Sequence, residues 1–168
     1  MNTKYLGDSY DLVKRFFSRE LTNIGYEVVA DPMFTGPWAD ADKSRLLNLV
    51  QVSPERKNVV GRTALFLDPD TGIHERQSRH HVSYARIAGE TESYQLVFSF
   101  DQSFSRREAP ITVIRRKIEA MRALGCSAMY YDSHARFLFA SRVDAVMELR
   151  EHLLSVGLPG SRLVGAGT

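Results

Sequence analysis

Thr63-Ala64-Leu65-Phe66-Leu67 is an unbroken apolar run that ends in Asp68-Pro69-Asp70. A short apolar run of this kind, closed by turn residues, is typical of a β-strand that is covered on both faces. Strands of this type occur in parallel sheets that carry helices on each side. Residues 63–67 therefore predict a buried strand in an α/β fold.

Predicted helices and strands alternate on either side of this run. Apolar residues at three- and four-residue spacing predict helices over residues 9–24, 42–50, 84–88, 111–124 and 142–156. Apolar runs predict strands over residues 26–30, 94–100, 127–131 and 136–140, with a short edge strand at 163–164. Residues 33–40, 54–62 and 72–82 are interpreted as loops.

Two of the predicted strands must pair antiparallel. Only Asp132-Ser133-His134 and Ala135 separate residues 127–131 from residues 136–140, which is too short for a crossover connection. We therefore expect one domain over residues 1–168, built as a three-layer, Rossmann-like, mostly parallel sheet. Helices should cover both faces, and an antiparallel hairpin should stand at the C-terminal end.

The composition is that of an ordinary globular protein. Of the 168 residues, 43% are hydrophobic and 25% charged, which argues against a disordered or fibrous chain. The net charge of +2 is too small to indicate a nucleic-acid partner by itself. Cys126 is the only cysteine, which excludes an intramolecular disulfide. No apolar stretch is long enough for a membrane span and no signal-peptide pattern is present, so we expect a cytoplasmic protein without membrane contact.

Aspartates follow four of the predicted strands. They are Asp31, the Asp68/Asp70 pair, Asp101 and Asp132. In open α/β sheets, ligands bind beyond the carboxyl ends of the strands, so these carboxylates should meet at one edge. Carboxylates at such an edge suit a general base or a divalent cation with oxygen ligands. Aspartate also starts turns and caps helices, which is the structural alternative for each one.

The strand-end residues supply two sets of candidates. The catalytic candidates are Asp68, Asp70, Asp101 and His134. If the site instead holds a metal, its ligands would be Asp68, Asp70, Asp101 and Asp132. His134 stands two residues after Asp132, where it could act as a general base or remain a solvated turn residue.

Arginines follow two of the acidic strand ends. Arg76 and Arg79 come after Asp68-Pro69-Asp70, and Arg106 and Arg107 come after Asp101. Guanidinium groups bind phosphate with paired hydrogen bonds, so these loops predict contacts with nucleic acid. A solvated charged surface is the alternative.

Residues 5–15 (Tyr-Leu-Gly-Asp-Ser-Tyr-Asp-Leu-Val-Lys-Arg) resemble the opening of bacterial adenine-N6 methyltransferases of large-subunit ribosomal RNA. In this comparison Asp68-Pro69-Asp70-Thr71 takes the place of the family's Asp-Pro-Pro-Tyr motif, which holds the adenine amine. The resemblance implies S-adenosylmethionine as cofactor and nucleic acid as partner. The chain departs from the family at Asp70 and Thr71, and no Gly-x-Gly loop follows an early strand.

The segment Phe66-Leu67-Asp68-Pro69-Asp70, with Gly72 after it, is also similar to uncharacterised bacterial and phage proteins. It further resembles the Asp-x-Asp motif of TOPRIM domains, which bind magnesium for phosphoryl transfer. TOPRIM domains also use a glutamate after their first strand, and Asp31 is the nearest residue to it here.

Three hypotheses remain open at this point. The first is a Rossmann-like, methyltransferase-related protein that acts on nucleic acid. The second is a nuclease or phosphodiesterase that depends on Mg²⁺ or Mn²⁺. The third is a catalytically inactive protein-binding module of phage or mobile-element origin, with Phe34 and Trp38 as contact residues. The loop that carries these two aromatics is interpreted either as exposed or as a flap over the core.

Overall fold

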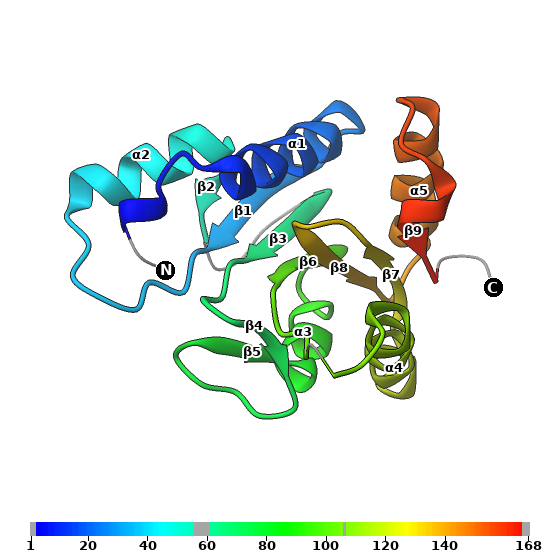
Figure 1. Cartoon of the computed structure of the whole chain (residues 1–168). Coiled ribbons are helices and arrows are strands. Elements are labelled where there is room, and N and C mark those ends of the chain that lie inside the picture. The colour runs from blue at the N-terminus through cyan, green and yellow to red at the C-terminus, as the bar shows by residue number, and fades with distance from the viewer. Residues whose placement is uncertain (1–2, 56–60, 106, 166–168) are drawn as a thin grey trace.

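The computed structural model describes residues 3–55, 61–105 and 107–165 (Figure 1). Its α-helices are α1 (Ser9–Asn23), α2 (Asp40–Val50), α3 (Tyr84–Glu90), α4 (Pro110–Ala123) and α5 (Ala145–Ser155). Its strands are β1 (Glu27–Asp31), β2 (Ser53–Pro54), β3 (Thr63–Leu67), β4 (Gly72–His74), β5 (His81–Ser83), β6 (Leu96–Asp101), β7 (Ser127–Tyr131), β8 (Arg136–Ser141) and β9 (Leu163–Val164). None of the helices within the described ranges combines the length and apolarity needed to cross a lipid bilayer.

Seven strands form one mixed sheet in the order β2-β1-β3-β6-β8-β7-β9. The pairs from β2 to β6 are parallel, and β8 pairs antiparallel with both β6 and β7. β7 therefore runs in the same direction as β6, so the sheet is mostly parallel, and the predicted α/β class is confirmed. The predicted strands at 26–30, 63–67 and 94–100 are parallel neighbours, as expected, whereas β8 lies between β6 and β7.

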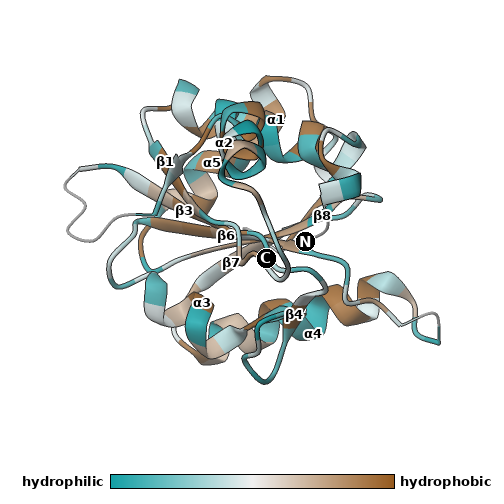
Figure 2. Cartoon of the chain, turned by 90° about the vertical axis from the view of Figure 1, so that its left-hand side faces the viewer, coloured by the Kyte–Doolittle hydropathy of each residue, from teal (hydrophilic) through white to brown (hydrophobic). Residues whose placement is uncertain are grey.

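The helices lie on both faces of this sheet (Figure 2). Side chains of a strand alternate between its two faces, so Val28 and Ala30 of β1 pack on one side and Val29 on the other. α1, α2 and α5 bury their apolar residues against the first face, for example Phe17 and Leu149. α3 and α4 cover the second face. The helices therefore cover the two faces of the sheet and not the ends of its strands.

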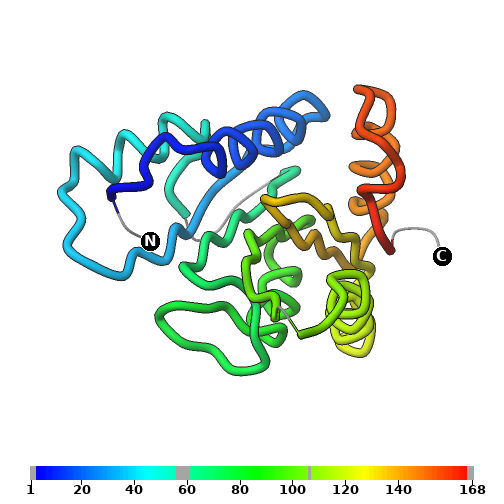
Figure 3. Tube along the Cα trace, viewed as in Figure 1, coloured from blue at the N-terminus to red at the C-terminus, as the bar shows by residue number. Residues whose placement is uncertain are grey.

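The segment after β3 is more ordered than its polar sequence indicates. The sequence predicts a loop over residues 72–82, and the chain does run out and back there (Figure 3). At the two ends of this segment, however, β4 and β5 form a separate two-stranded parallel sheet. Ile73 and Val82 are buried, and the Ile73 N–H donates to the Asp101 carboxylate at 3.0 Å. Strands of three residues are too short to show a period in the sequence, which is why this pair was missed.

The loop between β1 and α2 lies against the core. Trp38 is 8% exposed, and its ring packs against Phe34 with 4.7 Å between the centroids. The exposed-loop interpretation is therefore corrected in favour of the flap. Met33 in this loop has φ +47, a left-handed conformation that is uncommon outside glycine. A hydrogen bond from the Met33 N–H to the Asp31 carboxylate supports the turn.

Candidate functional site

A pocket of about 760 Å³ opens at the carboxyl edge of β1, β3 and β6. This volume lies within the roughly 300–1,000 Å³ that is usual for ligand sites. Its wall combines aromatic rings with carboxylates. It is built from the N-terminal segment (Thr3, Tyr5, Asp8, Tyr10, Asp11, Lys14), the loop after β1 (residues 35–38), the turn after β3 (residues 68–70), and Phe100 with Gln102.

The pocket lies where the chain reverses its direction across the sheet. β1 leads through α2 to β2 on one side, whereas β3 leads through α3 to β6 on the other. The loops after β1 and β3 therefore diverge toward opposite faces and leave a crevice between their ends. Ligands of open α/β sheets bind at such switch points. The topology thus places the Asp68-Pro69-Asp70 turn in the expected position for ligand binding.

A buried charge triad forms one wall of this pocket. The Lys14 Nζ donates to Asp11 at 3.0 Å and to Asp68 at 2.8 Å, and all three side chains are at most 5% exposed. Lys14 and Asp11 come from α1, whose start is fixed by Asp8, the helix N-cap. The triad therefore anchors α1 to the end of β3 and carries one negative charge in excess.

Burial and the neighbouring charges shift the pKa of Asp68. Burial raises the pKa of the Asp68 carboxyl, the attraction of Lys14 opposes this shift, and the nearby Asp11 adds to it; the pKa lies above its usual value. A carboxyl with a raised pKa holds its proton better in the folded than in the unfolded state. Its contribution to stability is therefore fully present below the unfolded pKa and is lost as the pH rises.

Asp68→Asn is accordingly expected to leave the free energy of unfolding unchanged or increased at pH 7. The variant keeps the Lys14–Asp11 pair and removes the unbalanced charge. The stability of the wild type should improve relative to the variant as the pH falls from 7 toward 4. Denaturant unfolding at several pH values measures both effects. A variant that is clearly less stable at pH 7 would contradict the unfavourable charge assigned to Asp68.

Asp70 lies in the same wall and is held from two directions. Its Oδ2 accepts a hydrogen bond from the Thr35 hydroxyl, and His80 Nδ1 lies 3.0 Å from the same oxygen. His80 Nε2 accepts from Arg79 Nε at 2.9 Å, which places the imidazole proton on Nδ1. Asp70 thereby connects the loop after β1 with the β4–β5 segment across the pocket wall.

Asp101 lies at the end of β6 but not in the pocket wall. It is 1% exposed and accepts hydrogen bonds from the Ile73 and Ser103 N–H groups, from Lys117 and from the Tyr130 hydroxyl. Burial alone would raise the pKa of Asp101, but Lys117 and the hydrogen bonds outweigh burial and bring the pKa below its usual value. Its contacts join β4, β6, β7 and α4, which is a structural role.

Asp132 and His134 also lie outside the pocket wall. Asp132 pairs with Arg136 at 2.9 Å, and the exposed His134 packs its ring against Tyr10, 5.6 Å between centroids. Asp31 likewise has its own cation, Arg86, at 2.7 Å. The proposed ligands Asp68, Asp70, Asp101 and Asp132 are thus paired separately. No group of three or more His, Cys, Asp or Glu side chains within the described ranges is arranged to hold a metal ion.

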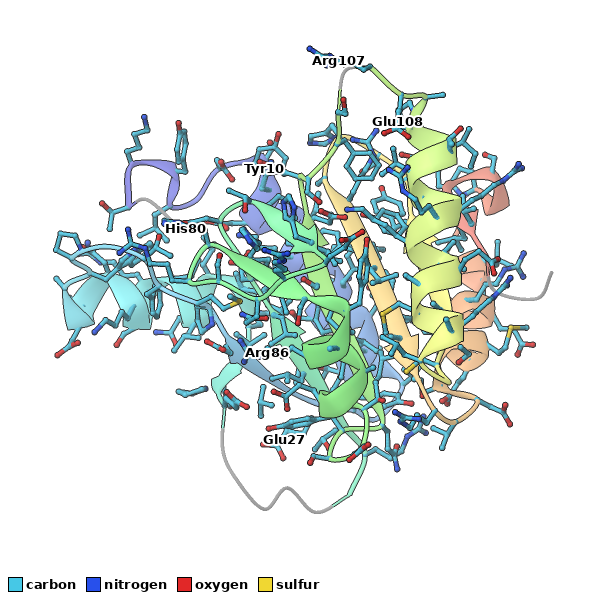
Figure 4. The ribbon with its side chains drawn as sticks, turned by 90° about the horizontal axis from the view of Figure 1, so that it is seen from below. Tyr10, Glu27, His80, Arg86, Arg107 and Glu108 are labelled. Atoms are coloured by element: carbon cyan, nitrogen blue, oxygen red, sulfur yellow. The ribbon has the colours of Figure 1, made fainter. Side chains whose placement is uncertain are left out.

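Three of the four arginines predicted to bind phosphate belong to the described residues. Arg76, Arg79 and Arg107 are exposed, and Arg106 lies outside the described residues. In Figure 4, Arg107, His80 and Tyr10 lie toward one end of the molecule and Glu27, at the start of β1, lies at the other. Their position is compatible with a basic rim beside the pocket.

Sequence patterns give little indication of several residues at the site. Lys14 resembles any basic residue of a helix, and its pairing with Asp68 spans 54 positions of the chain. His80 stands in a polar, basic stretch in which nothing in the sequence distinguishes it from its neighbours. The amphipathic phase of α1 offers one overlooked signal, because Asp11 and Lys14 fall next to the apolar positions Phe17 and Leu21 that face the core. No family model matches the chain, and neither curated proteins nor solved structures gave a significant match.

Proposed function

We propose that this protein is a Rossmann-like, methyltransferase-related enzyme that acts on nucleic acid in the pocket at the carboxyl edge of its sheet. The proposal includes the fold type, a three-layer, Rossmann-like arrangement with a C-terminal antiparallel hairpin. The observation that carries it is the joining of Asp68-Pro69-Asp70 to the N-terminal segment 5–15 in one pocket. These are the two segments on which the resemblance to adenine-N6 methyltransferases rests.

The chemistry of the pocket wall suits a nucleobase. Tyr5, Tyr10, Trp38 and Phe100 offer ring faces and edges for stacking, and Asp70 offers carboxylate oxygens to an exocyclic amine. Four carboxylates, those of Asp8, Asp11, Asp68 and Asp70, face a single lysine in this wall. The negative excess disfavours phosphate inside the pocket. It favours the amine edge of a base, with the phosphates outside near the exposed arginines.

S-adenosylmethionine, the cofactor that the resemblance implies, is compatible with the same wall. Its sulfonium and ammonium groups are cations, which aromatic rings and carboxylates attract, and its adenine can stack on a ring. The residues that would hold it are Asp8, Asp11, Trp38 and those of the loop at 35–37. When bound, it supplies an activated methyl group. Asp68 and Asp70 would orient the amine that receives the methyl group.

The pairing of the aspartates makes the metal-dependent alternative the weaker proposal. Two-metal hydrolases need carboxylates that converge on ions about 4 Å apart. Asp68 and Asp101 are instead paired with Lys14 and Lys117, respectively. The burial of Trp38 removes one of the two aromatic contact residues that the protein-binding alternative would use. The cytoplasmic location stays a prediction.

The expected result is saturable quenching or enhancement of Trp38 fluorescence by S-adenosylmethionine. Trp38 is the single tryptophan of the chain and lines the pocket, so its emission reports occupancy. Transfer of a radioactive methyl group to single-stranded DNA or RNA should follow and should be lost in Asp70→Asn. Nucleic-acid cleavage that requires Mg²⁺ or Mn²⁺, without methyl transfer, would instead establish the nuclease alternative.

The exposed arginines provide a separate test of nucleic-acid binding. The triple variant Arg76→Ala/Arg79→Ala/Arg107→Ala should bind more weakly and with a smaller salt dependence. Each lost phosphate contact should lower the slope of log K against log salt by about 0.7–0.9. An unchanged slope would show that phosphates bind elsewhere.

A further inference from the structure

Tyr10 connects the inside of the pocket to its outer surface. Its ring packs edge-on against Phe100, which lines the pocket, at a centroid distance of 5.4 Å. The same ring also contacts His134, with 5.6 Å between the centroids and an interplanar angle of 41°. His134 is exposed and belongs to the turn between β7 and β8. The aromatic wall of the pocket thus continues outward as the Tyr10–His134 pair.

The charge on this side is opposite to that of the pocket. Arg136 pairs with Asp132, and Arg162 donates to the Asp132 backbone carbonyl at 3.0 Å. Arg162 belongs to the neighbouring segment Gly160–Arg162, and the Arg136 guanidinium lies over the Phe104 ring, 4.3 Å from its centroid. Two guanidinium groups therefore meet one carboxylate at this end of β7 and β8, which gives a local excess of positive charge. A phosphate that follows a base held in the pocket would be attracted to this turn and repelled by the pocket wall.

We infer that the Tyr10–His134 pair is a stacking platform for the base that neighbours the one in the pocket. The inference rests on the proposed function and extends it to the substrate class. A neighbouring base can lie on this pair only when it is unstacked from the first, so the partner is a single-stranded or locally opened nucleic acid. Aromatic stacking platforms of this kind accept any base, because every base has a π-face.

The test compares one base with several. Trp38 fluorescence is titrated with adenosine 5′-monophosphate and with the trinucleotide dT-dA-dT, using the wild type, His134→Ala and His134→Phe. The wild type is expected to bind the trinucleotide about tenfold more tightly than the mononucleotide. His134→Ala should bind the mononucleotide as the wild type does and lose most of the tenfold gain. His134→Phe should keep the gain, since it retains a ring without the imidazole nitrogens.

The outcomes separate this inference from the proposed function. A trinucleotide that binds no more tightly than the mononucleotide, or a gain that survives in His134→Ala, overturns the stacking platform while the pocket assignment stands. A gain that is lost in both His134 variants overturns it too, because the imidazole nitrogens and not stacking would then carry the contact. If neither ligand binds the wild type, the proposed function fails, and the platform fails with it.

Discussion

Asp101→Asn is expected to lower the free energy of unfolding by about 3–5 kcal/mol, because it leaves the buried ammonium of Lys117 without its counter-ion. The side chains of this pair are 0% and 5% exposed, so water cannot replace the lost partner. The amide would also disturb the hydrogen bonds from Ile73, Ser103 and Tyr130. Urea unfolding at pH 7 measures the effect.

Asp132→Asn is the matched control for this change. Asp132 also ends a strand and pairs with an arginine, but both side chains of that pair are 22–27% exposed. A partly exposed pair contributes about 1 kcal/mol or less, so the control should stay close to the wild type. The double variant Asp101→Asn/Lys117→Met should recover much of the lost stability by removing the unpaired charge. Equal losses in Asp101→Asn and Asp132→Asn would refute the structural role of Asp101.

The effect of Asp101→Asn should also depend on pH. A carboxyl whose pKa lies below its usual value stabilises the fold above the unfolded pKa, and this contribution is lost as the pH falls. The difference between the wild type and Asp101→Asn should therefore stay constant from pH 7 to about pH 5 and narrow as the pH falls below about 4. Asp68→Asn should show the opposite trend, because the pKa of Asp68 is raised.

Gly72→Ala is expected to cost roughly 2–5 kcal/mol, which is a large part of the stability of a domain this size. Gly72 has φ +98, and an added Cβ would lie 2.1 Å from the Asp101 carboxylate and 2.7 Å from the Gln102 backbone nitrogen. The backbone conformation alone costs about 1–2 kcal/mol with a side chain, and the contact with Asp101 adds to it. Thermal unfolding provides the measurement.

Gly25→Ala is the control that separates these two causes. Gly25 has φ +87 at the end of α1, and an added Cβ would meet no atom within 4 Å. It should show only the backbone cost. Because the Cβ of Gly72→Ala would displace Asp101, combining that change with Asp101→Asn should cost less than the sum of the single changes. Strict additivity would mean that Gly72 and Asp101 act independently.

Local rules were sufficient for most of the secondary structure. The apolar run at 63–67 is β3, and all of its residues are buried. Asp8 caps α1, as its position before the apolar stripe indicates, and the short connection after residue 131 makes β7 and β8 antiparallel. Each of these features depends on a few neighbouring residues. β4 and β5 are not evident from the sequence because strands of three residues show no period, and β4 is held by contacts of Ile73 with Asp101 and with Lys117 of α4, far away in the sequence.

The candidate site was predictable only as a location. Parallel strands carry their following residues to one edge, so the arrival of Asp68 and Asp70 at a pocket there follows from strand order. The role of each carboxylate did not follow. Asp68 and Asp101 are similar strand-end aspartates in the sequence, yet the pKa of the first is raised and that of the second lowered.

The sequence by itself determined the α/β class, the order of the main elements and the edge at which the aspartates gather. These properties arise from hydrophobic period, caps and connection lengths, all of which act over a few residues. The tertiary structure alone decided which cation meets which carboxylate, the burial of Trp38 and the placement of His134 beside Tyr10 outside the pocket. Electrostatic pairing and burial depend on distances between segments that lie far apart in the chain, and those distances exist only after the sheet has assembled.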